Sequence, residues 1–127
     1  MINSLSVKYK ILRETFGFDK FRPGQEAVID TLLSGQNVLA VMPTGSGKSF
    51  CFQVPALIRP GLTIVISPLV SLMQDQVTAL RILGVAAVSI NSSQSRAENV
   101  AAWRQVAAGE IKIIYLAPER MMTERML

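Results

Sequence analysis

The chain has 127 residues, of which 50% are hydrophobic and 17% are charged. This composition supplies the core of one small domain, or of part of a larger one, and it excludes a disordered chain. The formal net charge of +4 permits a polyanionic partner, although the 13 Lys and Arg residues form no basic block.

The cysteine and histidine content limits the chemistry further, because Cys51 is the only cysteine and histidine is absent. One thiol cannot form an intrachain disulfide, and zinc sites need several Cys or His ligands. The first ten residues contain no unbroken apolar segment, and the apolar runs elsewhere are too short to span a bilayer. These features predict an intracellular protein without a membrane partner, which is cytoplasmic if the source is a bacterium.

The chain begins with two predicted helices. Residues 5–16 place apolar side chains at spacings of three and four, which predicts an amphipathic helix that Gly17 ends. A second helix is expected to open at Pro23 and to run to Gly35.

The turn before the second helix brings aromatic side chains close to Arg22 and Gln25. The Gln25 amide can donate to and accept from one adenine edge, while Phe18 and Arg22 offer flat surfaces for stacking on the base. The alternative is that Gln25 only caps the helix. An adenine site is favoured because a phosphate-binding pattern follows in the chain.

That pattern is a predicted strand, a tight turn and a helix start. Residues 38–42 have the branched apolar character of a buried parallel strand, and residues 48–54 can begin a helix. Turn amides and a helix N-terminus hold anions such as a triphosphate. Lys48 supplies a positive charge at the outer phosphates, and the Ser49 hydroxyl can ligate Mg²⁺. The residues assigned to this phosphate loop are Thr44, Gly45, Ser46, Gly47, Lys48 and Ser49.

The general phosphate-loop pattern begins with glycine, where this chain has Met42. Two alternatives therefore stay open at this point: an ordinary glycine-rich loop that caps a helix, and a small-molecule kinase with a phosphate loop.

Three more strands are predicted over residues 62–66, 85–90 and 111–116, and they alternate with helices. The helix after the first of them opens at Ser67-Pro68, and the helix after the second begins with a Ser95–Glu98 capping box. The apolar stripe expected to pack on the first of these helices is Leu69, Leu72, Met73, Val77 and Leu80. The alternation predicts an α/β fold with a mostly parallel sheet and helices on both faces.

Residues 18–25 and 42–49 together resemble the opening of a RecQ-family DNA helicase, within helicase superfamily two. Residues 67–77 are similar to that family's motif Ia, and residues 115–121 to its motif Ib. The family also does not require glycine at Met42. The resemblance implies a RecA-like P-loop fold, ATP and Mg²⁺ as cofactors, and DNA as the partner of a parent that translocates 3′ to 5′.

The resemblance also implies roles for single residues. Lys48 is the expected catalytic residue, and Ser49 is the expected ligand of Mg²⁺. The residues implied to contact adenine are Phe18, Arg22 and Gln25. The residues implied to lie along the DNA are Ser67, Pro68, Pro118, Glu119 and Arg120.

The first motor domain of this family is longer than the chain. Residues 1–127 are therefore expected to form its N-terminal portion, incomplete at the C-terminus, with the Walker B strand and the second motor domain beyond residue 127. We expect no ATP turnover from this chain alone, marginal stability, and self-association through unpaired strands. A non-catalytic nucleotide- or nucleic-acid-binding module is the alternative.

Overall fold

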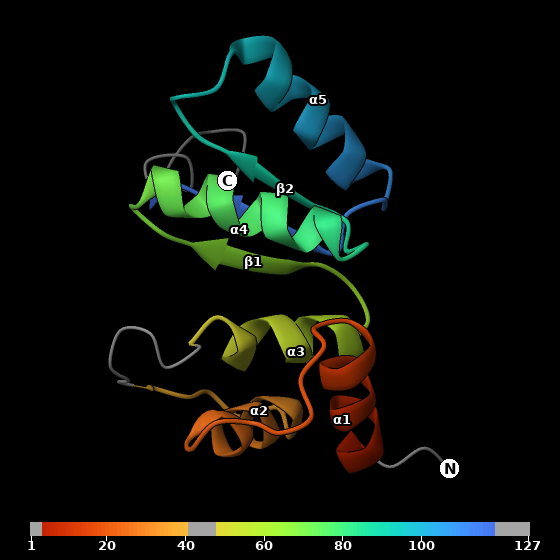
Figure 1. Ribbon diagram of the computed structural model, residues 1–127. Helices are drawn as coiled ribbons and strands as arrows, with labels where there is room; N and C mark the ends of the chain where they lie inside the picture. Colours follow the sequence, from red (N-terminus) through yellow and green to blue (C-terminus); the bar gives the residue numbers. More distant parts are fainter. Residues whose placement is uncertain (1–3, 41–47, 119–127) are drawn as a thin grey trace. The chain divides into compact units, whose positions relative to one another are not determined.

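The structure, a computed structural model, describes residues 4–40 and 48–118. The chain divides into two compact units, residues 1–60 and residues 61–127. In the described part, the first unit consists of helices and the second contains the sheet (Figure 1).

The first unit contains α1 (Ser4–Glu14), α2 (Gln25–Leu33) and α3 (Phe50–Ile58). Both α1 and α2 pack against α3. Each helix buries apolar side chains, so the unit has a small core of its own, to which burial supplies the main stabilising free energy. The core residues are Leu12, Ile29, Cys51, Val54 and Ala56.

Glycines set the ends of the first two helices. Gly17 adopts a φ of 79°, and the Phe18 N–H donates to the Leu12 carbonyl at 3.1 Å, which closes α1 with a left-handed cap as predicted. The predicted start of α2 at Pro23 is wrong. The helix begins at Gln25, because Gly24 has a φ of 88° and interrupts the helical backbone.

The second unit holds three parallel strands, β1 (Thr63–Ile66), β2 (Ala87–Ile90) and β3 (Ile113–Leu116). Their order across the sheet is β1-β3-β2, so the strand that comes last in the sequence lies in the middle. The connecting helices are α4 (Val70–Ile82) and α5 (Arg96–Ala107). These elements confirm the predicted α/β fold with a parallel sheet.

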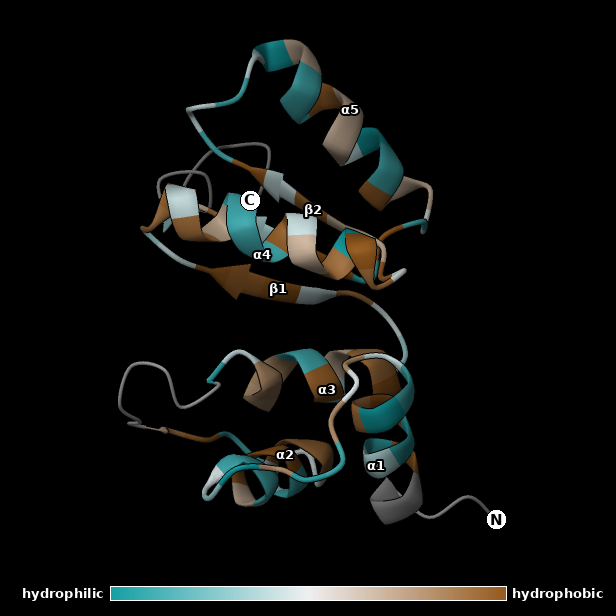
Figure 2. Ribbon diagram, in the orientation of Figure 1, coloured by the Kyte–Doolittle hydropathy of each residue, from teal (hydrophilic) through white to brown (hydrophobic). Residues whose placement is uncertain are grey.

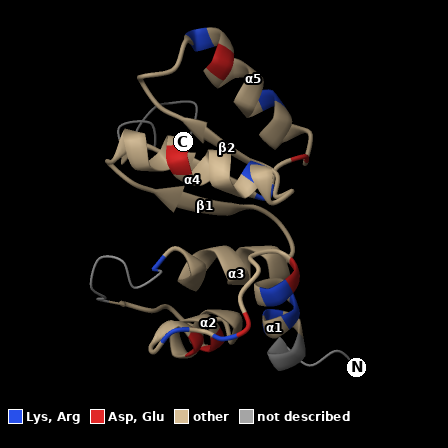
Figure 3. Ribbon diagram, in the orientation of Figure 1, with Lys and Arg blue, Asp and Glu red and all other residues tan. Residues whose placement is uncertain are grey.

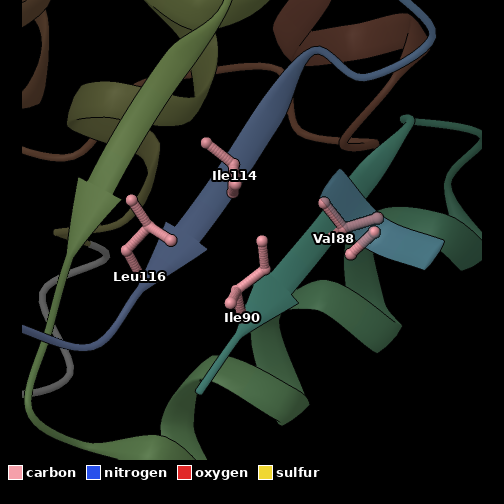
Figure 4. Close-up of a cluster of buried hydrophobic side chains, with 5 residues drawn as sticks. Val88, Ile90, Ile114 and Leu116 are labelled. Atoms are coloured by element: carbon pink, nitrogen blue, oxygen red, sulfur yellow. The ribbon is translucent and has the colours of Figure 1, made fainter. Parts of the chain in front are cut away.

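The α5 side of the sheet carries the apolar cluster of this unit. Val88, Ile90, Ile114 and Leu116 point to one another from β2 and β3 (Figure 4). Ala102 of α5 is buried with them, and three partly buried side chains pack against the cluster: Trp103, Val106 and Ile111. Trp103 therefore packs in the interface between α5 and the sheet.

The other helix, α4, also packs against β2. Both faces of β2 and β3 are buried, which fits helices on both faces of the sheet. Met73, Val77 and Leu80 are buried as predicted, whereas Leu69 and Leu72 are 58% and 43% exposed. That part of the predicted stripe is wrong, because Leu69 precedes the first turn of α4 and Leu72 lies outside its buried face. The hydropathy colouring in Figure 2 shows brown segments on the strands and on these helices.

The strand expected over residues 38–42 is wrong where the structure describes it. Residues 38–40 have no strand conformation, and Leu39 is 92% exposed. A strand needs a hydrogen-bonded neighbour, and no described strand pairs with this segment. Residues 41 and 42 lie outside the described part of the chain.

Candidate functional site

The turn that leads into α2 is built on the capped end of α1. The turn begins directly after the cap at Gly17, with Phe18, whose side chain is 49% exposed. The Phe18 ring lies 5.5 Å from the Phe50 ring, measured between centroids, and the Phe16 ring lies 4.8 Å from the same partner. Because Phe50 is the first residue of α3, aromatic contacts join this turn to the start of that helix.

Gln25 is the buried residue of this turn, with a relative exposure of 1%. Its Oε1 accepts a hydrogen bond of 2.7 Å from the Arg22 N–H, and the Gln25 N–H donates to the Arg22 carbonyl at 3.1 Å. Both bonds close the turn around Gly24. The Gln25 side chain thus performs the helix-start role that the sequence left as an alternative, and its amide is fixed in one orientation. The Arg22 side chain is exposed beside it.

A cluster of charged and phenolic side chains joins α1 to α2. The Lys8 ammonium, on a side chain that is 1% exposed, lies 2.9 Å from a Glu26 carboxylate oxygen and 2.5 Å from an Asp30 carboxylate oxygen. The Tyr9 hydroxyl donates to Glu26 at 2.7 Å. Figure 3 shows basic and acidic residues on these two helices. We call these four residues the α1–α2 clamp.

The clamp shifts the pKa values of its members. Burial disfavours the charged form of Lys8, but hydrogen bonds to Asp30 and Glu26 outweigh it and raise its pKa. The hydrogen bond from Tyr9, followed by that from Lys8, lowers the pKa of the Glu26 carboxyl. The same bond to Glu26 raises the pKa of the Tyr9 hydroxyl. All three shifts favour the charge state in which the clamp is closed at neutral pH.

Lys48 and Ser49 lie directly before α3. Ser49 is the N-cap residue with helical backbone angles, and its side chain makes no capping hydrogen bond. Lys48 is exposed and helps to line a pocket of about 250 Å³ together with apolar side chains of α2 and α3. Thr44, Gly45, Ser46 and Gly47 lie outside the described residues. A cation and an uncommitted hydroxyl at a helix N-terminus fit a phosphate and a magnesium ion.

The described members of the predicted DNA-side set, Ser67, Pro68 and Pro118, follow β1 and β3 at the carboxyl edge of the sheet. The Ser67 N–H donates to the Leu116 carbonyl at 3.0 Å, and the Ser67 hydroxyl accepts from the Leu69 N–H at 3.2 Å. Because β1 and β3 are parallel and in register, this edge also carries Pro118, which is exposed like Pro68. Ligands of open α/β sheets bind at this edge. Glu119 and Arg120 lie outside the described residues.

Sequence reasoning missed a polar network on β2. The Gln94 amide nitrogen donates to the Ser89 carbonyl at 2.8 Å and to the Asn99 side chain at 2.7 Å, while Gln94 Oε1 accepts from Gln74 and from the Ser89 hydroxyl, both at 2.8 Å. The amide thus joins α4, β2 and α5. The available signal was a loop rich in amides directly after a strand, but spacing alone does not show that such side chains turn inward.

Two further features follow from a search of residues 4–40 and 48–118. No three acidic, Cys or His side chains in these ranges lie together as a metal site would require. No helix in them is long and apolar enough to cross a membrane. The assignment of Ser49 to Mg²⁺ stays a prediction from the sequence pattern.

Comparisons with known proteins agree with the predicted family. Residues 22–126 match the DEAD/DEAH box helicase family. The ATP-dependent DNA helicase RecQ of Haemophilus influenzae is 48% identical over 113 residues, which cover 89% of this chain and 18% of that protein. RecQ of Bacillus subtilis is 47% identical over 112 residues, covering 87% of this chain and 19% of that protein. The chain thus spans less than a fifth of the length of these curated relatives.

A solved structure supports the fold. The crystal structure of a hypothetical ATP-dependent RNA helicase from Sulfolobus tokodaii matches with a TM-score of 0.75 and 22% identity, covering 95% of this chain and 35% of that chain. The resemblance to RecQ helicases seen in the motifs is confirmed by the sequence identities. Since the family match extends over most of the chain, this protein belongs to the DEAD/DEAH box helicase family.

Proposed function

We propose that the first unit binds ATP with Mg²⁺ and that the chain is the N-terminal segment of the first motor domain of a RecQ-like 3′–5′ DNA helicase. The observation that carries this proposal is the contact between the Phe18 and Phe50 rings. It brings Phe18, in the segment that leads to Gln25, against the first residue of α3, which directly follows Lys48 and Ser49. Base-side and phosphate-side residues thus belong to one small unit.

Each residue then has a distinct task in nucleotide binding. Lys48 neutralises charge on the outer phosphates, as the catalytic residue of the complete site, and Ser49 holds the metal. The Ser49 hydroxyl would hold Mg²⁺, which would supply positive charge against the phosphates when bound. Gln25 reads the adenine edge, and Phe18 and Arg22 stack on the base. The backbone of Thr44, Gly45, Ser46 and Gly47 is assigned to the phosphates.

The carboxyl edge of the sheet is assigned to DNA. The residues assigned to DNA are Ser67, Pro68 and Pro118 at this edge, and Glu119 and Arg120, which follow Pro118 in the sequence. The RecQ names of the relatives support DNA as the partner, and a cytoplasmic location in a bacterial cell would follow from that substrate. The helicase family match does not support the small-molecule kinase alternative.

We also propose that this chain does not turn over ATP by itself. Hydrolysis needs an acid that holds the metal at the end of a strand and a group that orients the attacking water. Of the acids in the sequence, Glu119 comes closest to the position expected for a metal-holding acid after a strand, but it belongs to the segment that resembles motif Ib. The non-catalytic nucleotide- or nucleic-acid-binding module stays as the second candidate.

Nucleotide binding is tested with the 127-residue chain and its Lys48→Ala variant. Wild type should bind ATP–Mg²⁺ weakly, and Lys48→Ala should weaken binding by about tenfold to a hundredfold, since charge-assisted contacts contribute about 1.5–3 kcal/mol. Lys112→Ala, a lysine of the second unit, serves as the control. Equal binding by wild type and Lys48→Ala would contradict the proposal. Steady-state phosphate release with DNA that exceeds background and is lost in Lys48→Ala would contradict the expected inactivity.

The base assignment is tested with Gln25→Ala. Loss of two opposed hydrogen bonds should lower the affinity for ATP by about 1–3 kcal/mol and leave that for GTP nearly unchanged. Gln36→Ala replaces an exposed glutamine of the same unit and should change neither affinity. Equal losses for ATP and GTP would remove adenine recognition from Gln25.

A further inference from the structure

Tyr9 touches both sides of the turn that holds Gln25. Its ring lies 5.2 Å from the Phe21 ring, before the turn closes, and its hydroxyl donates to Glu26, directly after Gln25. One side chain of α1 is therefore in contact with the segment that enters the turn and with the helix that leaves it.

Lys8, the neighbour of Tyr9 in α1, also contacts α2. Glu26 and Asp30 are four residues apart, so both project from one side of α2, and both pair with the Lys8 ammonium. Gln25 and Ile29, which are also four apart, form the buried side. The two ion pairs thus fix the rotation of α2 about its own axis, and with it the direction in which Gln25 enters the unit.

Burial makes this constraint stronger than an ordinary surface ion pair. The Lys8 side chain is 1% exposed, so its ammonium has exchanged water for the two carboxylates. Rotation of α2 would leave that charge without partners in a poorly hydrated place, which is strongly unfavourable. The Gln25 amide is held at the same time by its bond from the Arg22 N–H.

We propose that Lys8 and Tyr9 are positioning residues for base recognition: through Glu26, Asp30 and Phe21 they hold the Gln25 amide in the orientation that distinguishes adenine from guanine. This inference rests on the proposed nucleotide site. It adds residues of α1, outside the segments that resemble helicase motifs, to the set that determines which nucleotide is bound.

The test compares three ligands by ligand-detected NMR on the 127-residue chain: ATP, GTP and inorganic tripolyphosphate. Tripolyphosphate reports phosphate binding without a base. The variants are Tyr9→Phe, which keeps the ring on Phe21 and removes only the hydroxyl, and Lys8→Met, which keeps the apolar stem. Lys10→Met, at an exposed position of the same helix, is the matched control.

We expect the ratio of ATP to GTP affinity to fall about threefold in Tyr9→Phe and about fivefold in Lys8→Met, because one net hydrogen bond corresponds to about a fivefold change in an equilibrium constant. The affinity for tripolyphosphate should stay unchanged in both, and Lys10→Met should behave as wild type. Lys8→Arg keeps a buried cation and should retain most of the ratio.

A merely structural role would weaken the binding of all three ligands together. That result, or an unchanged ratio of ATP to GTP affinity in both variants, would overturn the inference. If Lys8→Met does not fold, Tyr9→Phe decides alone, since its change is one hydroxyl. Binding that does not depend on Lys48 in wild type would instead overturn the proposed nucleotide site and this inference with it.

Discussion

The two edges of the sheet differ in their hydrogen bonding. At the β2 edge, side chains donate hydrogen bonds to the backbone carbonyls that face away from the sheet. At the β1 edge, no described residue of the second unit is seen to bond the outward-facing backbone groups. On β2, the Ala87 carbonyl accepts from the Arg81 side chain and the Ser89 carbonyl accepts from the Gln94 side chain, both at 2.8 Å. On β1, the outward groups belong to Ile64 and Ile66, whose side chains are 47% and 50% exposed.

This contrast indicates which edge of the sheet can pair with an additional β-strand. An edge strand with free N–H and C=O groups is a template for another strand, and covering those groups prevents such pairing. The β2 edge is closed by polar side chains from α4 and from the loop before α5. The β1 edge is open and apolar, so we expect any further strand, or a second copy of this chain, to pair there.

The largest expected effect comes from Gln94→Leu. The substitution removes four hydrogen bonds and leaves the Ser89 carbonyl and Asn99 Oδ1 without the donor that Gln94 provides, which should lower the free energy of unfolding by about 2–4 kcal/mol. Denaturant unfolding followed by circular dichroism measures it. Gln105→Leu, at an exposed glutamine of α5, is the control and should change stability little. Equal stability of the two variants would mean that the network does not close this edge.

The next effect concerns the open edge. Ile66→Lys places a charge on the apolar side of β1 and should raise the dissociation constant for self-association about tenfold or more, because burying an unpaired charge between two strands is unfavourable. Analytical ultracentrifugation over a concentration series gives the constant. Ile82→Lys, on α4 and 80% exposed, should leave association as it is. A wild-type chain that stays monomeric with a sharp thermal transition would show that the β1 edge is not used, and that the expected marginal stability is wrong.

The smallest effect is expected from Arg81→Met. Loss of the hydrogen bond to the Ala87 carbonyl should lower the free energy of unfolding by about 1 kcal/mol, since Arg81 is exposed and water can replace its bond. Association should rise slightly as part of the β2 edge opens. Arg104→Met, on an exposed position of α5, provides the comparison. A stability change larger than that of Gln94→Leu would reverse the order of importance given to the two side chains.

The sequence predicted most elements of the fold because their signals are local. Gly17 ends α1, the Ser95–Glu98 capping box opens α5, and short branched runs form β1, β2 and β3. The apolar run at residues 38–42 gave the same signal, yet residues 38–40 are not a strand. Strand propensity describes a fit to a sheet, and pairing depends on a neighbour that local pattern cannot supply.

The candidate site divides in the same way. Residue types and spacing predicted Gln25, Lys48 and Ser49 as site residues, and the structure places Phe18 against Phe50 at the start of α3. The clamp was not predicted, because Lys8 and Asp30 are 22 residues apart and surface helices usually carry such charges in solvent. Only packing of α1 on α2 shows that the lysine is buried.

The position of Cys51 allows the reactivity of its thiol to be used as a probe of local opening in the first unit. This thiol is the only one in the chain, is 6% exposed and belongs to the second residue of α3, and burial raises its pKa. Reaction with a thiol reagent should therefore be slow while the start of α3 stays packed, so the rate of labelling reports local opening at the start of that helix. A nucleotide bound at the start of α3 should slow the labelling reaction in proportion to its occupancy. The labelling rate of this buried cysteine would then report both nucleotide binding and local unfolding.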